Sequence, residues 1–519
     1  MIPILNKGKD PKKATSYRPI SLTSCVVKTL ERIVNERLRW YLESRNLLAP
    51  EQAGFRQFRS TEDQVTYLAQ EVEDAFQEQK LVFVTWIDLQ KAFDKVWKDG
   101  LLVKLLRKGV SSNMYQWIRS YLYNRRARVN VDQTKSKKFL LRRGVPHGGV
   151  LSPTLFIDDL VSEMPKGIKA ALYADDVVIW CKEEHASTAT YRMQQAADRL
   201  NAWAEDWCVS INKEKSSTTL FTLSPKQKAG TIRLGGTPLR EDEEATYLGV
   251  TFDRRHTWKP HIAQAETKAR RKLAILRKLA GTTWGANEKI LKTVYQGTIR
   301  PHLKYGSTAW STSAKTNLQT LDRVKNQALR LITGAMKSTP IKEMEKLTTI
   351  QPLCQRREAK TMVQAEKLKC LPDHPMKHRL SNLTKNRLKR SSFVHESKRL
   401  SRQYREVLPP NTLPLTQEEE ETPEATEKPG IQICTSVPHV ISGEDQNDTA
   451  RQALTLALID EQYPKEAWIH VYTDGSATNA VLNGGAGILI QFPGGHTATS
   501  SVATGKHCTN YKAEAEALM

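Results

Sequence analysis

Residues 170–181 read AALYADDVVIWC, so two adjacent carboxylates, Asp175 and Asp176, interrupt an apolar run that is typical of a β-strand. Adjacent acids in apolar surroundings are costly unless something neutralises them. A tight hairpin that presents both carboxylates to a divalent metal would do so, since magnesium prefers oxygen ligands. Most Asp-Asp pairs are turns or solvated surface, so this pair alone is weak support for a metal site.

Another carboxylate has a similar setting. Residues 82–89 read VFVTWIDL, and Asp88 stands at the C-terminal edge of this apolar run, where sheet enzymes place their chemistry. Asp94 follows in the segment 91–96, which we expect to begin a helix, and it need not share a face with Asp88. Asp88, Asp175 and Asp176 are therefore candidates to converge on two metal ions, an arrangement suited to phosphoryl transfer.

The composition excludes several classes of protein. The chain has 519 residues, a formal net charge of +23 and 39% hydrophobic residues, which is too apolar for wholesale disorder. Its seven cysteines are scattered without a CxxC pair, so we expect no disulfide scaffold or zinc ribbon and a reducing compartment. The sequence predicts no secretory signal and no membrane span. The positive charge favours polyanions as partners, nucleic acid first and acidic membrane second, although a soluble protein can simply be basic.

The pattern along the chain predicts a sheet domain followed by helices. Helical segments at 27–42 and 65–77 alternate with strands at 81–89, 170–181 and 217–223, which indicates an α/β or α+β domain. From about 258 to 403 helix formers dominate, with basic tracts at 268–278 and 367–405. We expect this half to face nucleic acid, the alternative being solvated helix surface.

The C-terminal part is separated by a segment of different composition. Residues 408–430 are rich in Pro, Glu and Thr and predict a disordered linker. Beyond it, residues 468–473 and 485–491 are expected to form a hairpin-like pair of strands.

Several motifs follow one another in a fixed order along the chain. They are SYRPISL (16–22), QAGFR (52–56), RSTED (59–63), Asp88 to Val96, GVPHGGVLSP (144–153), YADD (173–176), Trp207-Cys208 with Ile211-Asn212 and Lys215, and TYLGV (246–250). Together these motifs resemble the reverse transcriptase of non-LTR (LINE-type, jockey-like) retrotransposons. The resemblance covers roughly residues 1–255 and is much weaker over 256–400. Residues 471–476 (VYTDGS) and 510–514 (NYKAE) resemble the start of a ribonuclease H domain.

The resemblance implies an α+β fold and a domain order. We expect a right-hand palm and fingers polymerase domain at 1–255, a helical, basic, thumb-like region at 256–407, an acidic linker at 408–465 and a partial ribonuclease H α/β segment at 466–519. The implied activity is RNA-directed DNA synthesis from a primer 3′-OH, with Mg²⁺ (or Mn²⁺) as cofactor. The implied partners are an RNA template, a DNA primer or target and deoxynucleoside triphosphates. No membrane partner is expected, the oligomeric state stays open, and we expect action in the nucleus after a cytoplasmic RNA-bound stage.

The family's roles carry over position by position. Asp88, Asp175 and Asp176 would be catalytic and bind the metals, and Asp474 and Glu514 would bind metal in the ribonuclease H segment. Phe93 would be the steric gate against a ribose 2′-OH, or simply core. The remaining family positions are His147, Gly148 and Lys215 at the nucleotide, Arg18 and Arg56 in the fingers near the template or nucleotide, and Tyr247, Leu248 and Gly249 at the primer grip. For Arg18 and Arg56 the alternative is a solvated side chain, which is what an exposed arginine usually is. For Lys215 the alternative of a charged loop residue is equally favoured.

The sequence also departs from the family pattern. Only about 50 residues of the ribonuclease H fold precede Met519, too few for an adequate core, so we expect no ribonuclease H activity. About three residues are missing after Phe156, which in an α-helix removes about 4.5 Å and turns the downstream face by about 60°. His147 stands where the family has glutamine, and no upstream endonuclease is present, so target cleavage is not expected of this chain. Two rival readings are a catalytically dead relic that only binds nucleic acid and a host-used polymerase of telomerase or intron-maturase type.

Overall fold

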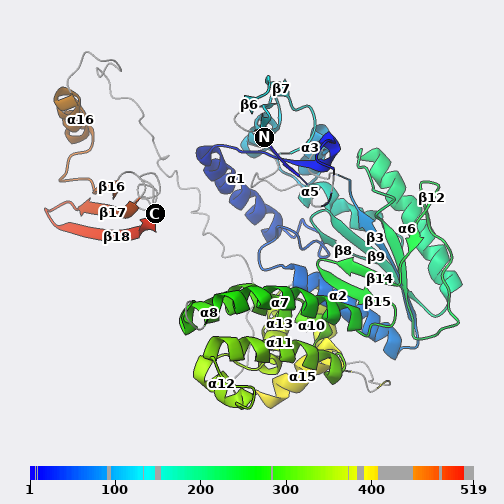
Figure 1. Ribbon diagram of the computed structural model, residues 1–519. Coiled ribbons are helices and arrows are strands. Elements are labelled where there is room, and N and C mark those ends of the chain that lie inside the picture. Colours follow the sequence, from blue (N-terminus) through cyan, green and yellow to red (C-terminus); the bar gives the residue numbers. More distant parts are fainter. Residues whose placement is uncertain are drawn as a thin grey trace. The chain divides into compact units, whose positions relative to one another are not determined.

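The protein forms two compact units, Met1–Glu419 and Glu420–Met519, each of which is described by itself (Figure 1). The division falls within the predicted linker. The computed structural model describes residues 1–5, 8, 10–90, 95–131, 134–145, 154–281, 285–371, 373–382, 388, 391–406, 448–478 and 482–507.

A five-stranded sheet in the order β13-β10-β3-β9-β8 is the centre of the first unit. Its strands are β3 (Leu81–Asp88), β8 (Ile168–Tyr173), β9 (Asp176–Glu183), β10 (Ser217–Phe221) and β13 (Arg240–Glu241). β10 and β13 run parallel, and the other pairs are antiparallel. The three predicted strand runs are confirmed, and the run 170–181 is a hairpin of two strands.

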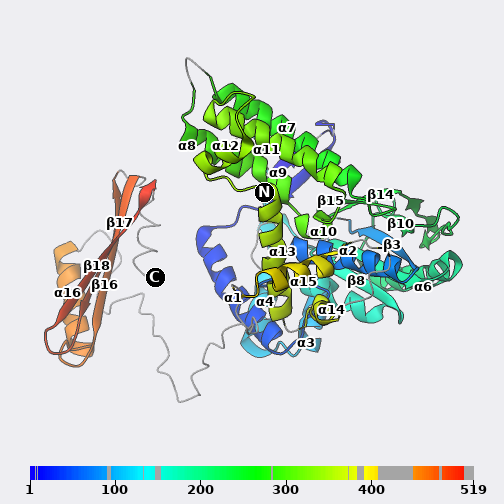
Figure 2. The same cartoon turned by 90° about the horizontal axis from the view of Figure 1, so that it is seen from below.

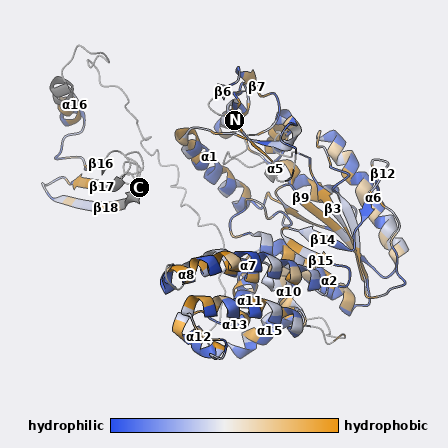
Figure 3. Cartoon of the chain, in the orientation of Figure 1, coloured by the Kyte–Doolittle hydropathy of each residue, from blue (hydrophilic) through white to orange (hydrophobic). Residues whose placement is uncertain are grey.

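The central strands are buried on both faces, which explains why they are apolar at nearly every position (Figure 3). Alternate residues of β3 belong to two different cores. Val82, Val84 and Trp86 pack in the core that includes α2 (Thr61–Gln77). Leu81, Phe83 and Ile87 pack in the core that includes α6 (Ala186–Asp206).

The remaining elements of the first 255 residues surround this sheet. The predicted helix 27–42 is confirmed within α1, whose N-terminus is capped where the Val27 N–H donates to Ser24 Oγ. The elements are β1 (Ile2–Leu5), η1 (Ala14–Ser16), β2 (Tyr17–Ile20), α1 (Cys25–Ser44), α3 (Lys98–Arg107), α4 (Ser112–Leu122), β4 (Arg126–Ala127), β5 (Asn130–Val131), β6 (Thr134–Lys135), β7 (Phe139–Leu140), α5 (Thr154–Ile157), η2 (Asp158–Glu163), β11 (Arg233–Leu234), β12 (Thr237–Pro238), β14 (Glu244–Tyr247) and β15 (Val250–Asp253).

The region predicted as helical is helical, and its core is continuous with that of the sheet (Figure 2). The shared core runs from Phe76 and Trp86 through Trp258 and Leu329 to Val394. The helices are α7 (Lys259–Leu279), α8 (Glu288–Val294), the π-helix η3 (Tyr295–Ile299), α9 (Arg300–Lys304), α10 (Ser307–Trp310), α11 (Lys315–Thr333), α12 (Ile341–Thr348), α13 (Leu353–Cys370), α14 (Pro375–Ser381) and α15 (Phe393–Gln403). No helix among the described residues is long and apolar enough to cross a membrane.

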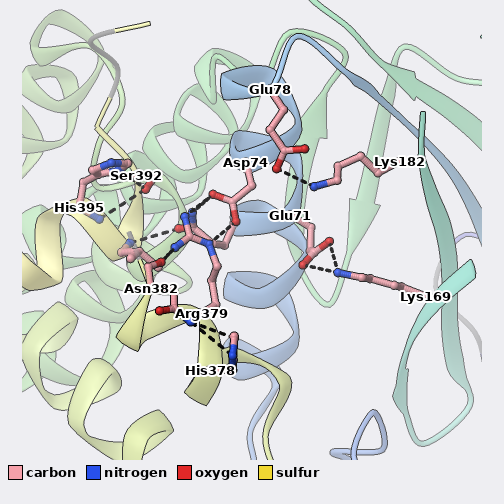
Figure 4. Close-up of polar contacts among 12 residues, drawn as sticks. Glu71, Asp74, Glu78, Lys169, Lys182, His378, Arg379, Asn382, Ser392 and His395 are labelled. Carbon is pink, nitrogen blue, oxygen red and sulfur yellow. Dashed lines mark hydrogen bonds and ion pairs between the residues drawn. The ribbon is translucent and has the colours of Figure 1, made fainter. Parts of the chain in front are cut away.

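Two basic residues of the tract 367–405 face α2 rather than a nucleic acid. The Lys367 ammonium lies 2.8 Å from a carboxylate oxygen of Asp63, which is fully buried. The Arg379 guanidinium binds both carboxylate oxygens of Asp74 (Figure 4). For these two side chains the prediction of a nucleic-acid-facing position is wrong, because buried acids on α2 require cationic partners.

An adjacent face of α2 is tied to the sheet. Lys169 of β8 donates to both oxygens of Glu71 at 2.8 Å, and Lys182 of β9 donates to Glu78, at the C-terminal end of α2, at 2.8 Å (Figure 4). Helix α2 therefore forms ion pairs both with the sheet and with α13 and α14.

The second unit contains α16 (Asp448–Gln462) and an antiparallel sheet of β16 (His470–Thr478), β17 (Leu482–Gln491) and β18 (Thr497–His507). The predicted hairpin is confirmed, with His470 opposite Gln491, whereas β18 was not predicted. Among the side chains that the structure describes in this unit, Ala486 is the buried hydrophobic one, and Ile469 and Val471 are more than half exposed.

Candidate active site

Two of the predicted carboxylates are direct partners across the sheet. β3 ends at Asp88, and the antiparallel register places Asp88 opposite Asp176, the first residue of β9. Directly opposed residues project from the same face of a sheet, with Cβ atoms about 5 Å apart. By the alternation of β3 and β9, this is the face of Trp86 and Val178, on the side of α2 and the C-terminal helices.

The turn between β8 and β9 places Asp175 beside this pair. Tyr173 pairs with Asp176, so Ala174 and Asp175 are the two central residues of the hairpin. Ala174 has φ of +57°, the conformation that a type II′ turn requires at its first central position. The predicted tight hairpin with adjacent carboxylates is thus confirmed.

The QAGFR segment packs directly against this turn. The Ala53 N–H donates to the Leu172 carbonyl at 2.9 Å, and the Leu172 N–H donates to the Glu51 carbonyl at 3.0 Å. A Cβ atom at Gly54 would lie 2.3 Å from the backbone nitrogen of Ala174. Glycine is required at position 54 because the two backbones approach so closely, a role that residue spacing did not reveal.

The segment after the YADD box completes the end of β3. The Asn212 N–H donates to the Asp88 carbonyl at 2.8 Å, and the Asp88 N–H donates to Ser216 Oγ at 3.1 Å. These bonds bring the Lys215 ammonium to 3.7 Å from the Asp88 carboxylate. Ser216 was not predicted, since nothing in its local sequence distinguishes it from an ordinary strand residue.

The three carboxylates lie close enough together to repel one another. Burial, and then the proximity of Asp175 and Asp88, raise the pKa of Asp176 to about 6. Within the described residues, no three His, Cys, Asp or Glu side chains are gathered as a ready-made metal site. The three carboxylates nevertheless supply the oxygen ligands that a hard divalent cation prefers. A bound cation would also relieve the repulsion among them. Asp88, Asp175 and Asp176 therefore fit Mg²⁺ or Mn²⁺ in their chemistry.

Several predicted site residues lie outside the described residues, namely Phe93, His147, Gly148 and Glu514. In the segment 91–96 the helix was expected to begin, but residues 95–97 are not helical and α3 starts at Lys98. Asp474 lies on β16 of the second unit, exposed and opposite Gly487.

The two predicted fingers arginines have different settings. Arg18 is exposed on β2, opposite Ile4 of β1. The Arg56 side chain is only 8% exposed and donates from Nε to Glu43 at 2.8 Å and from a terminal nitrogen to the Ala49 carbonyl at 2.9 Å. The structure gives Arg56 an internal partner, and its contact with a template stays a prediction.

The predicted primer-grip residues form the tip of the β14–β15 hairpin. Leu248 and Gly249 both have positive φ, as the two central residues of a type I′ turn require. Tyr247 packs on Trp86, and its hydroxyl donates to the Ala171 carbonyl at 3.5 Å, directly beneath the YADD hairpin. The Leu248 carbonyl accepts a 2.6 Å hydrogen bond from Tyr305, which ties the tip to the helical region.

The segment after Phe156, which the family resemblance predicts to be shortened, forms the single turn α5 followed by the 3₁₀ helix η2. Lys108, which follows α3, pairs with Asp158 at 2.7 Å, and Lys104 of α3 pairs with Asp159 at 2.6 Å. Burial lowers the pKa of Lys104 to about 8 against the opposing effect of Asp159. These two ion pairs tie η2 to α3 and its C-terminal end.

Residues 10–252 match the family described as reverse transcriptase (RNA-dependent DNA polymerase). The chain is 33% identical over 336 residues to a probable RNA-directed DNA polymerase from transposon BS of Drosophila melanogaster, covering 63% of this chain and 37% of that protein. It is 31% identical over 344 residues to the RNA-directed DNA polymerase from mobile element jockey of the same species, covering 64% and 37%. The chain thus spans little more than a third of the length of these curated relatives. A solved structure of apo telomerase from Candida tropicalis is similar with a TM-score of 0.35 and 9% identity, covering 66% of this chain and 54% of that one.

Proposed function

We propose, from the premise that residues 10–252 form a reverse transcriptase domain of the jockey-like non-LTR retrotransposon type, that this chain adds deoxynucleotides to a primer 3′-OH with RNA as template. The observation that carries the proposal is the register of β3 and β9, which sets Asp88 opposite Asp176 beside the Asp175 turn. The net charge of +23 supports a nucleic-acid substrate.

The cofactor we propose is Mg²⁺ or Mn²⁺, held by Asp88, Asp175 and Asp176. Such ions supply Lewis-acid stabilisation of the charge that develops on the transferred phosphoryl group. The protein's own part is to hold the three carboxylates together at the end of β3, at the start of β9 and in the turn before β9. The role that we propose for Lys215, whose ammonium lies 3.7 Å from the Asp88 carboxylate, is to donate a proton to a departing pyrophosphate oxygen.

The test is primer extension on an RNA template with purified protein and magnesium. Asp175→Asn is expected to abolish extension while leaving template binding nearly unchanged. Asp198→Asn, the same substitution at an exposed position of α6, is the matched control and is expected to extend normally. Extension by Asp175→Asn at the wild-type rate would refute the assignment. Salt-sensitive binding without extension by the wild type would favour a relic that only binds nucleic acid.

A further inference from the structure

The last strand of the second unit has an edge without a neighbouring strand. The sheet order is β16-β17-β18, so among the strands that the structure describes β18 pairs only with β17 (Figure 1). The backbone N–H and C=O groups along its other edge can pair with another extended chain, and natural proteins usually protect such an edge with charged residues, prolines or bulges. Whether β18 accepts another strand therefore depends on which of these protections it has.

Most of β18 has none of them. Residues 497–503 read TATSSVA, with no charged residue and no proline, and they pair with β17 without a shift in register. The bulge comes only after Ala503, because Gly485 pairs with Ala503 and Gly484 pairs with Gly505. Lys506, the charged residue nearest to this stretch within the strand, follows the bulge in the sequence. A regular and uncharged stretch of β18 is therefore open to pairing.

The other outer strand, β16, is better protected. Its centre carries the exposed carboxylate of Asp474, and its register shifts between Ser476 and Thr478. Pairing of two β16 strands about their centres would bring two such carboxylates close together, and like charges that face each other destabilise a sheet. The edge of β18 is thus the better place for two sheets to associate.

The symmetry of residues 497–503 indicates what pairs with them. Antiparallel pairing of two copies about Ser500 makes every opposed pair uncharged and composed of small or β-branched residues, which fit between strands. The pairs are Ser500 with the partner's Ser500, Thr499 with the partner's Ser501, Ala498 with the partner's Val502, and Thr497 with the partner's Ala503. Each contact between unlike residues occurs twice, as a two-fold interface requires. The stretch is thus complementary to itself.

The same register also continues the apolar face of the sheet. Val471 is 56% exposed and Val502 is 52% exposed, and the pairing of both strands with β17 places them on one face. Residues that oppose each other in an antiparallel pair share a face, so the partner's Ala498 would lie beside Val502. A shift of one residue would instead join unlike faces of the two sheets. Pairing about Ser500 therefore keeps the apolar side chains of both copies on one side.

We propose that the second unit associates with a second copy of this chain through the edges of two β18 strands, paired antiparallel about Ser500. The product is one continuous sheet, with three strands from each copy, that joins two chains. This inference is independent of the proposed activity. Because the paired stretch is short, the association is expected to be weak and to depend on protein concentration.

Cysteine cross-linking of the full chain tests the register. Residues that face each other in an antiparallel pair have Cα atoms about 4.5–5.5 Å apart, which suits a disulfide, so Ser500→Cys is expected to form a covalent dimer under mild oxidation. Val502→Cys is the matched control, because the two copies of residue 502 would be offset by about 14 Å along the strands. Both variants retain the native cysteines. Equal cross-linking of the two variants, or none with Ser500→Cys, would overturn the proposal.

Sedimentation of the full chain tests the association without a cross-link. The wild type is expected to approach the mass of a dimer as its concentration rises, and Ser500→Lys is expected to remain a monomer because two lysines would face each other. His496→Lys adds the same charge in the turn before β18 and is expected to associate like the wild type, as is the neutral variant Ser500→Thr. Association of Ser500→Lys equal to that of the wild type would contradict the proposal.

Salt separates strand pairing from bridging by a nucleic acid. The chain has a net charge of +23, so two copies repel each other and added salt is expected to strengthen the pairing of β18. Two copies held together by one nucleic acid would instead separate as the salt concentration rises. A dimer that separates in salt or after nuclease treatment would overturn the proposal. A wild type that stays monomeric and binds an unrelated extended peptide would do so as well, since the edge would then serve a foreign strand.

Discussion

Gly54→Ala is expected to displace the YADD turn. The added Cβ would lie 2.3 Å from the Ala174 nitrogen and 3.0 Å from its Cα, and both atoms are backbone that cannot rotate away. Restoring a contact distance of about 3.5 Å requires the two segments to separate by about 1 Å. A displacement of about 1 Å at a reacting centre costs about 10²-fold in rate. Overpacking of this kind also costs about 1–3 kcal/mol of folding free energy.

The assay is steady-state primer extension together with the Kd for the primer–template duplex. We expect kcat to fall by about 100-fold with little change in Kd, because the substitution moves Asp175 and does not touch the basic helical region. Gly297→Ala is the control, since a Cβ at this position in η3 meets no atom within 4 Å. Gly54→Ala with wild-type kcat would refute the argument that close backbone packing positions the turn.

Three further predictions concern charged side chains. Because the pKa of Asp176 is raised to about 6 in the metal-free protein, that protein should lose stability as pH rises from about 4 through 6, which melting in chelator with Asp176→Asn as reference will check. Lys367→Met should destabilise the protein by about 2–3 kcal/mol in urea unfolding, since Asp63 is buried but retains other donors; an unchanged midpoint would contradict this. Arg56→Ala should lower the free energy of unfolding by about 3 kcal/mol, because it leaves the Glu43 carboxylate without its cationic partner, and it should leave the salt dependence of template binding unchanged. A reduced salt dependence would instead support the predicted contact of Arg56 with the template.

The carboxylate site was predictable because its signals are local. One apolar run ends in Asp88, and another is interrupted by Asp175 and Asp176. Each run predicts a strand and the point where it ends without information from the rest of the chain. The register between β3 and β9 could not be read from these runs. It depends on how the strands pair, and a shift of one residue would send Asp88 to the other face.

Helix α2 shows where reasoning from local pattern fails. Asp63, Gln70, Asp74 and Gln77 recur at helical spacing and would ordinarily indicate a solvated face. In the structure this polar stripe is buried, and its partners come from about 300 residues later in the chain: Lys367 on Asp63, Arg379 on Asp74, and the backbone N–H groups of Val394 and Leu388 on Gln70 and Gln77. A sequence shows the acids and the bases but not which of them meet.

The same helix links the C-terminal helices to the YADD turn. Gln64, one residue after Asp63, donates to the carbonyls of Glu51 at 2.7 Å and Leu172 at 3.3 Å, at the bridge that pairs Gln52 of the QAGFR segment with Leu172 of β8. Asp63 in turn accepts from Lys367 of α13. Each bond is modest by itself, but all of them restrain one buried helix turn. The helical region therefore contributes to the position of the Ala174–Asp175 turn. The expected boundary at residue 255 therefore marks a change in sequence character, and it does not mark an energetic boundary within the first unit.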